Sequence, residues 1–369
     1  MCDVPALRFP GFSGEWHKHS LGEIGETIIG LTYKPSDVVA DNGIIVLRSS
    51  NIKNGVIDYS DLVRVNKHVK DRIITKENDI LVCSRNGSQR LIGKNAIIKR
   101  EDINNTFGAF MMVYRSNDNP FILPLLSTRR YISQVGENLG ARINQITTSD
   151  FNGFEFYFPE NHVERAKIAE LFRLLDERIA TQNKIIEKLE TLIKGIIETV
   201  ISSQKPNTLI KNCLECNSST LQEIQVAETG AFPVYGATGI SGYTETADIN
   251  GESILIIKDG SGVGIVKFVT GEYSYIGTLN SLIAKDGYCL KYIYFSLQRF
   301  SFEPYKTGMA IPHIYFKDYG KAKIYCPSLS LQTLIAQKLS LIENKMEVEK
   351  RIILCYQLQK SYLLSRMFI

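Results

Sequence analysis

The sequence has 369 residues, a formal net charge of +4 and a pI of about 8.5, with 44% hydrophobic and 22% charged residues. These fractions are typical of a globular protein, and the length predicts about two or three domains. The small net charge excludes a strongly basic surface, so any contact with a polyanion must be local. Because we find no signal peptide and no apolar run of ~18–20 residues, we expect a cytoplasmic protein with no membrane contact.

The first part of the chain predicts a β-rich domain over 21–158. Residues 1–20 contain the only Trp and are interrupted by Pro and Gly, which predicts an irregular lead-in. The apolar stretch 120–133 predicts a short helix, and the alternating stretch 152–158 predicts a half-buried strand. Further strands, bounded by Asn, Asp and Gly, are predicted at 43–47, 79–83, 95–99 and 109–114.

A long helix is predicted over 159–205. Asn161 followed by Glu164 indicates a capping box just after Pro159, and Pro206 ends the helix because proline lacks the backbone donor. Apolar residues recur with the heptad spacing of a coiled coil. The predicted seam comprises Phe172, Leu175, Ile179, Gln182, Ile186, Leu189, Ile193, Ile196 and Val200.

The second part of the chain predicts a similar domain over 206–327 and a second long helix over 328–369. Its string LQEI at 221–224 echoes LGEI at 21–24. Strands are predicted at 253–257, 263–269 and 276–284, and a short helix at 292–300. The seam of the last helix comprises Leu339, Ile342, Met346, Glu349, Ile353, Tyr356, Lys360, Leu363 and Met367.

The two parts repeat one another. The string DILVCSRNGS at 79–88 aligns with SILIIKDGSG at 253–262, and TFGAFMMVYR at 106–115 aligns with YIGTLNSLIA at 275–284. A repeat far longer than a solenoid period implies two similar halves. We therefore predict an α+β fold, in which two globular domains with mixed or antiparallel sheets and short helices are joined by two long helices. The same spacing separates Gly140, Asp150 and Pro159 as separates Gly308, Asp318 and Pro327.

Gln182 and Glu349 occupy the same seam position in the two helices. A buried polar residue at such a position usually fixes the register of a coiled coil. If the helices pair antiparallel, the two side chains could bond each other near the middle. An alternative of equal weight is that one or both point outward through a local gap.

The sequence contains no motif for catalysis. It has no Asn/Asp-Pro-Pro-Tyr/Phe of amino-methyltransferases, no phosphate-binding GxxxxGK[ST] and no HExxH. The glycine-rich string at 259–264 precedes a predicted strand, which favours a hairpin turn. Cys213 and Cys216 have no second pair nearby and the five His residues are dispersed, so we expect no metal site. The chain alone is not expected to be an enzyme.

A pair of corresponding loops in each half suggests recognition of DNA. Loop 84–90 carries two Arg, an Asn and a Gln, the side chains that bind guanine and adenine edges in the major groove. Loop 142–145 corresponds to 310–313, and loop 258–262 is the counterpart of the first loop with different chemistry. Solvated hairpin turns are the alternative for each loop. The predicted DNA-contacting residues are Ser84, Arg85, Asn86, Ser88, Gln89, Arg90, Lys94, Arg142, Asn144, Gln145, Lys258, Asp259, Ser261 and His313.

The chain resembles the specificity (S) subunits of type I restriction-modification systems along nearly its whole length. The resemblance is carried by LRFPGF at 7–12 with Trp16 and LGEI at 21–24, by FPVYG at 232–236 with Gly239 and Gly242-Tyr243, and by the repeated unit of strand, proline and long helix. The order of target-recognition domain, helix, target-recognition domain and helix is the same.

The resemblance implies a DNA-binding subunit without catalysis or cofactor of its own. Each target-recognition domain would bind one half of a split site in double-stranded DNA, and the helices would pair antiparallel as a spacer with pseudo-twofold symmetry. Two methyltransferase subunits carrying S-adenosylmethionine would methylate adenine N6, and ATP-dependent endonuclease and translocase subunits would cleave unmodified DNA. A helix of ~34 residues is about 50 Å long, enough to set half-sites ~34 Å apart. The alternative is a protein-interaction scaffold whose paired helices bind partner helices.

Overall fold

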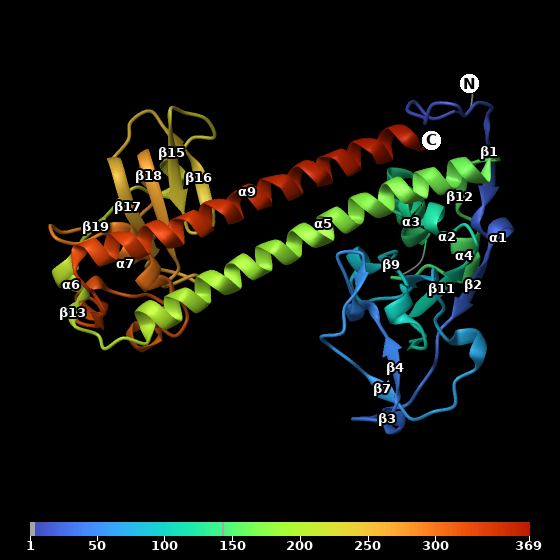
Figure 1. The fold of residues 1–369 in the computed structure, drawn as a ribbon, viewed down its shortest axis with the longest axis horizontal. Helices are drawn as coiled ribbons and strands as arrows, with labels where there is room; N and C mark the ends of the chain where they lie inside the picture. Colours follow the sequence, from blue (N-terminus) through green and yellow to red (C-terminus); the bar gives the residue numbers. More distant parts are fainter. Residues whose placement is uncertain (1–3, 142–143) are drawn as a thin grey trace. The chain divides into compact units, whose positions relative to one another are not determined.

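The computed structural model describes residues 4–141 and 144–369 (Figure 1). The chain divides into two compact units. Unit 1 comprises the chain up to Thr181 together with Ile352–Ile369, and unit 2 comprises Gln182–Arg351. Each long helix therefore contributes one end to each unit. No helix in these described ranges is long and apolar enough to cross a membrane.

Unit 1 is built on a four-stranded antiparallel sheet of order β2-β11-β8-β9. It also contains a four-stranded sheet of order β10-β4-β7-β3, the small pair β5-β6 and the antiparallel pair β1-β12. The strands are β1 Trp16–Ser20, β2 Glu26–Ile29, β3 Val38–Val39, β4 Ile44–Leu47, β5 Ile52–Lys53, β6 Val56–Ile57, β7 Arg64–Val65, β8 Ile80–Cys83, β9 Asn95–Ile97, β10 Thr106–Phe107, β11 Met111–Arg115 and β12 Glu155–Pro159. The α-helices of its globular part are α1 Leu21–Ile24, α2 Asn119–Leu125, α3 Arg129–Ala141 and α4 Thr148–Asn152.

The structure differs from the prediction in the lead-in and in the helix that follows β11. The lead-in is not irregular throughout, because β1 pairs with β12 and Trp16 is only 1% exposed. The helix predicted over 120–133 is two helices, since the Thr128 hydroxyl donates to the Leu125 carbonyl at 2.7 Å and accepts from the Tyr131 amide at 3.4 Å. A side chain that caps the next helix in this way separates it from the one before.

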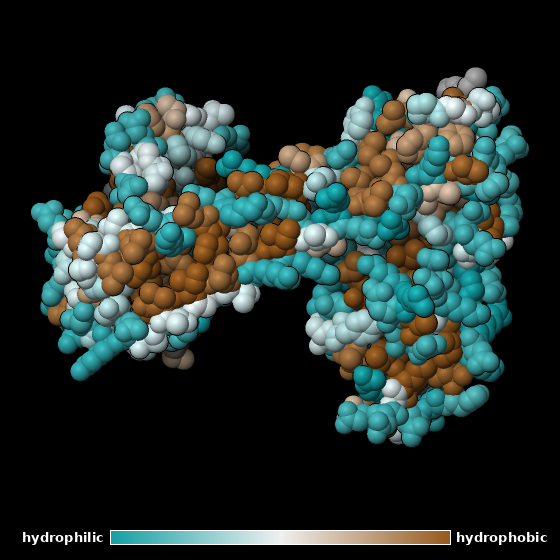
Figure 2. Space-filling view, in the orientation of Figure 1, coloured by the Kyte–Doolittle hydropathy of each residue, from teal (hydrophilic) through white to brown (hydrophobic). Residues whose placement is uncertain are grey.

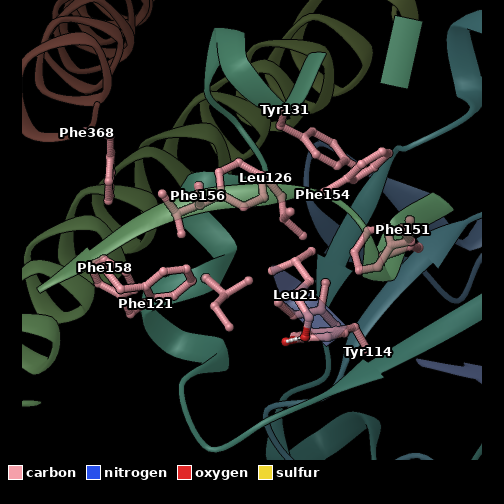
Figure 3. Close-up of a cluster of buried hydrophobic side chains, with 14 of the residues drawn as sticks. Leu21, Tyr114, Phe121, Leu126, Tyr131, Phe151, Phe154, Phe156, Phe158 and Phe368 are labelled. Atoms are coloured by element: carbon pink, nitrogen blue, oxygen red, sulfur yellow. Dashed lines mark hydrogen bonds between the residues drawn. The ribbon is translucent and has the colours of Figure 1, made fainter. Parts of the chain in front are cut away.

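The core of unit 1 is rich in aromatic rings. Figure 3 shows Phe121, Phe158 and Phe368 gathered on one side of this cluster and Phe151 and Phe154 on the other. Phe368 comes from the end of the last helix, and its ring centroid lies 5.7 Å from that of Phe121 and 6.4 Å from that of Trp16. Phe368, near the end of the last helix, therefore belongs to the same core as Trp16 of β1.

Unit 2 contains a six-stranded sheet of order β14-β19-β17-β18-β15-β16 and the short antiparallel pair β13-β20. The strands are β13 Thr208–Leu209, β14 Leu214–Ser218, β15 Phe232–Gly236, β16 Gly239–Thr244, β17 Ile249–Ile257, β18 Val266–Tyr275, β19 Leu279–Ala284 and β20 Lys323–Ile324. The short α-helices are α6 Ile210–Cys213, α7 Leu290–Gln298 and α8 Phe316–Tyr319. Helix α7 is buried along most of its length and joins the ends of both long helices in one core.

The same framework occurs in both units. The order β2-β11-β8-β9 of unit 1 recurs as β14-β19-β17-β18 in unit 2, and the pair β1-β12 recurs as β13-β20. Helix α1 follows β1 directly, as α6 follows β13, so the counterpart of LGEI is 210–213 and not LQEI at 221–224. Leu21 and Ile210 are both fully buried, whereas Ile224 is 89% exposed. The similarity of LQEI at 221–224 to LGEI at 21–24 therefore does not reflect structural correspondence, because the two segments lie in different environments.

The long helices are α5, His162–Ile197, and α9, Leu329–Met367. In unit 1 Phe172 packs against Phe368 with ring centroids 5.5 Å apart, and Lys360 bonds Asp176 at 2.5 Å. Phe172 precedes Asp176 in α5, whereas its partner Phe368 follows Lys360 in α9, so the two helix segments run antiparallel in unit 1. The expected capping box is incomplete: the Asn161 side chain accepts from the Val163 amide at 2.9 Å, but Arg8 engages the Glu164 carboxylate.

The predicted seam positions of α9 are all buried or half-buried, from Leu339 to Met367. Those of α5 are buried or half-buried from Phe172 to Ile196, but Val200 is 37% exposed. Ile197 and Ile201 take its place in the core of unit 2, at 1% and 3% exposure. Val200 lies in the π-helical turn Glu198–Ser202 that continues α5. A helix with 3.6 or more residues per turn drifts from a strict heptad, so the buried stripe moves by one residue near the helix end.

The polar seam residues are accommodated locally. Glu349 is 4% exposed and forms an ion pair with Lys345 on the preceding turn of α9. Gln182 is half-buried. The buried charge at Glu349 is thus paired within its own helix.

Replacing Lys360 by Leu is expected to leave the free energy of unfolding within about 1 kcal/mol of wild type, or to raise it. Lys360 is a half-buried seam residue that pairs with Asp176, whose side chain is 44% exposed. Such pairs rarely stabilise a protein more than an apolar residue of similar volume does. Denaturant unfolding measures the change. A loss of several kcal/mol would mean that this ion pair is a main support of the helix pair.

Candidate nucleic-acid interface

Loop 84–90 leaves the end of β8 and is fixed to the residue that precedes β11. The Ser84 and Arg85 amides and the Ser84 hydroxyl all donate to the Phe110 carbonyl, at 3.0, 3.1 and 2.9 Å. The Cys83 thiol donates to the Arg85 carbonyl at 3.7 Å, and burial raises the pKa of this thiol to about 11. Cys83 therefore stays a neutral thiol at neutral pH and serves as an anchor beneath the loop.

The structure brings loop 84–90 together with the predicted second loop. Arg85 and Gln145 form an antiparallel bridge, and the Ile146 amide donates to the Ser84 carbonyl at 2.9 Å. Asn144, whose φ of 54° is in the left-handed region, donates from its side chain to the Gly87 carbonyl at 3.2 Å. Arg142, also predicted to contact DNA, lies outside the described residues.

The predicted DNA-contacting residues of loop 84–90 differ in their exposure and in their hydrogen bonds within the fold. Arg85, Ser88, Gln89 and Arg90 are exposed, the last two in a single 3-10 turn. The Asn86 amide is occupied, because it donates to the Ser49 hydroxyl at 2.9 Å and accepts from the Ser88 amide at 3.0 Å. Ser84 and Lys94 are half-buried at the base. The exposed groups suited to base edges are therefore chiefly the two Arg and the Gln.

Unit 2 holds the counterpart residues in the same way. Asp259 and His313 form an antiparallel bridge, and the Ile314 amide donates to the Lys258 carbonyl at 2.9 Å. The Lys258 amide donates to the Thr278 carbonyl at 3.0 Å, as Ser84 does to Phe110. We call residues 84–86, 110 and 144–146 the first loop frame, and residues 258–260, 278 and 312–314 the second loop frame. Ser261 is exposed at the edge of the second.

The strand registers fix which residues correspond. Met111 pairs with Cys83 and Leu279 pairs with Ile257, so Phe110 corresponds to Thr278. The sequence alignment of these two strings had placed Phe110 opposite Leu279, one residue away, and so treated it as part of a strand. Phe110 is 60% exposed and lies against Arg85. Phe110 directly precedes the apolar run MMVYR, which is buried from Met111 to Tyr114, so no signal in the sequence separates it from the strand.

The two loop frames carry different side chains on one scaffold. The first presents Arg85, Phe110 and Gln145, and the second presents Asp259 and His313 with exposed apolar neighbours Met309 and Ile311. The His313 ring packs edge-on against Tyr315 at 5.1 Å. Different chemistry on one frame is the arrangement expected of two binding sites with separate specificities.

The structure describes Cys213, Cys216 and the glycine-rich string, which were ambiguous in the sequence. Within the described parts of the chain no group of three or more metal-ligating side chains occurs. Cys213 is fully buried. The glycine-rich string at 259–264 connects β17 to β18, and the Gly264 amide donates to the Ile257 carbonyl at 2.9 Å, as in a hairpin turn.

Comparison with known proteins identifies the family. The family model for the type I restriction modification DNA specificity domain matches residues 13–191 and 210–354, which is most of the chain and covers both units in turn. The chain belongs to the type I restriction-modification specificity subunit family. The expected resemblance and the α+β architecture with two repeated domains and two long helices are thereby confirmed.

Two members of this family are similar to the chain over parts of their length. The chain is 26% identical over 251 residues to the type I restriction enzyme StySPI specificity subunit of Salmonella potsdam, covering 66% of this chain and 53% of that protein. It is 27% identical over 192 residues to the EcoKI specificity subunit of Escherichia coli K12, covering 50% and 37%. The chain thus spans about half the length of the first of these relatives and less of the second.

A solved structure agrees with the fold over the full chain. The S subunit of the type I restriction-modification system of M. genitalium superposes with a TM-score of 0.70, at 18% identity, covering 99% of both chains. At this identity the match supports the fold and not the residues that contact a ligand.

Proposed function

We propose that this chain is the non-catalytic DNA-recognition subunit of a type I restriction-modification complex, and that it binds a target in two separated parts. The observation that carries the proposal is the pair of loop frames, in which the bridges Arg85 to Gln145 and Asp259 to His313 occupy corresponding places. Each frame would contact the base edges of one half-site, while Lys and Arg near it contact phosphates. The antiparallel helix segments would set the gap between the half-sites.

The proposal includes partner subunits that carry the catalysis. Two methyltransferase subunits would bind S-adenosylmethionine and methylate adenine, and endonuclease and translocase subunits would act on unmodified DNA. The surface over the long helices is apolar in places (Figure 2), and α9 of unit 2 exposes Leu334, Leu341 and Val348 at 50%, 64% and 48%. These residues recur every seven positions, which forms one stripe along the helix and suits the packing of a partner helix.

The binding of duplex DNA by this chain with its methyltransferase subunits is expected to weaken steeply with salt. Each phosphate neutralised by Lys or Arg releases a counterion, so about six such contacts would lower the affinity roughly a thousandfold between 50 and 200 mM salt. A titration with fluorescent duplexes, with and without the target, measures this dependence. The alternative, a protein-interaction scaffold, predicts no specific DNA binding at any salt concentration but intact binding of partner subunits.

A further inference from the structure

The exposed ring of Phe110 has a specific neighbour. The Arg85 guanidinium lies over it, with the Cζ atom 5.2 Å from the ring centroid. A guanidinium stacked on an aromatic face is attracted by the ring quadrupole and keeps its planar edge free. Because Phe110 is 60% exposed, packing in the core does not explain why a large apolar residue stands at this place.

The backbone of Arg85 is held on both sides. Its amide donates to the Phe110 carbonyl at 3.1 Å, its carbonyl accepts from the Cys83 thiol, and it bridges to Gln145. The stack on Phe110 then fixes the long side chain as well. A side chain ordered in advance loses less conformational freedom on binding, which favours affinity and specificity.

The side-chain donors of Arg85 have no partner among the described residues. Arg130 provides a comparison, since its guanidinium lies over Tyr157 at the same 5.2 Å but its Nε donates to the Glu155 carbonyl at 2.7 Å. The Arg130 guanidinium thus has a hydrogen-bond acceptor within the fold, whereas the guanidinium of Arg85 can donate to an acceptor on a bound ligand. The acceptor pair that a guanidinium matches in duplex DNA is O6 and N7 of guanine.

We propose that Arg85 recognises one guanine of the first half-site in the major groove, and that Phe110 is the positioning residue for its guanidinium. This inference rests on the proposed function. The second loop frame has Asp259 and Thr278 at the corresponding places, so the contact belongs to one half-site only. A carboxylate there cannot donate to guanine.

The test uses the chain assembled with its methyltransferase subunits and duplexes in which 7-deazaguanine replaces each guanine in turn. This base keeps Watson–Crick pairing but lacks the N7 acceptor. Wild type is expected to lose about 10- to 100-fold in affinity at one position of the first half-site. Arg85→Ala is expected to bind natural DNA more weakly and to show no further loss at that position.

Substitutions of Phe110 separate positioning from a structural role. Phe110→Leu is expected to reduce the discrimination at that position several-fold, while Phe110→Tyr retains it because the aromatic face is kept. The thermal midpoint is expected to be unchanged in both, since the ring is exposed. Arg130→Ala, the matched control, is expected to leave the whole 7-deazaguanine profile as in wild type.

Three results would overturn the inference, and the third would also overturn the proposed function. Specific wild-type binding combined with an unchanged 7-deazaguanine profile in Arg85→Ala would exclude the guanine contact alone. A uniform loss across all sequences with a smaller salt dependence would identify Arg85 as a phosphate contact instead. Wild-type binding without any sequence preference would overturn both.

Discussion

Replacing residues 84–88 by their counterparts from unit 2 is expected to change the first block of the DNA target and to leave the second block intact. The five substitutions are Ser84→Lys, Arg85→Asp, Asn86→Gly, Gly87→Ser and Ser88→Gly. The graft should fold, because both loop frames hold these residues by the same bridge and by the same hydrogen bond from the amide of the first loop residue to the carbonyl of the residue before the neighbouring strand. Loss of one good bidentate contact lowers preference for a base about 10- to 100-fold.

The measurement for this graft is the sequence motif methylated by the assembled complex, determined by mapping modified adenines. The reverse graft, which places SR at 258–259 and GS at 261–262 and keeps Gly260 because its φ is 101°, is the matched control and is expected to change only the second block. The gap between the blocks should be the same in both variants. If neither graft altered either block, the loop frames would not be the recognition surfaces.

Arg8→Ala is expected to lower the free energy of unfolding by about 3 kcal/mol or more. Glu164 at the start of α5 is fully buried, and Arg8 binds both of its carboxylate oxygens at 2.6 and 2.7 Å. Removal of Arg8 leaves a buried charge without its partner, which costs far more than the loss of a surface pair. The Leu7 amide also donates to the Arg366 carbonyl at 2.8 Å, so this segment joins the start of α5 to the end of α9 within unit 1.

Urea unfolding measures this loss, and two further variants control for it. Arg8→Ala combined with Glu164→Gln is expected to be more stable than Arg8→Ala alone, because the amide carries no charge. Arg173→Ala, which breaks ion pairs with the exposed Glu170 and Glu177, is expected to change the unfolding midpoint little. Equal losses for Arg8→Ala and Arg173→Ala would mean that Glu164 is not buried in solution.

The parts of the fold that repeat a local pattern could be predicted from the sequence. The heptad of α9 places Leu339, Ile353 and Met367 in the interior because a helix orients side chains by a fixed rotation. The same rule failed by one residue at Val200, which lies in a π-helical turn at the end of four heptads, where the difference in period had accumulated. Loops 84–90 and 258–262 could also be identified, since their polar residues interrupt apolar strands.

The parts that depend on distant partners could not be predicted. Trp16 lies in a stretch rich in Pro and Gly, and only its pairing with β12 and the ring of Phe368 makes it a core residue. The sequence analysis placed Phe110 in a strand, although β11 begins at Met111. The limits and register of a strand depend on hydrogen bonds to a neighbouring strand, and the sequence does not show these bonds. The β-bridge between Arg85 and Gln145 is likewise a contact between segments far apart in the sequence.

The central claim, that each unit recognises its own part of one DNA target, is tested most directly by mapping methylated adenines in DNA modified by this chain with its methyltransferase subunits. The account predicts a motif of two specified blocks separated by a fixed gap of unspecified bases. A single uninterrupted block, or methylation without any motif, would contradict it.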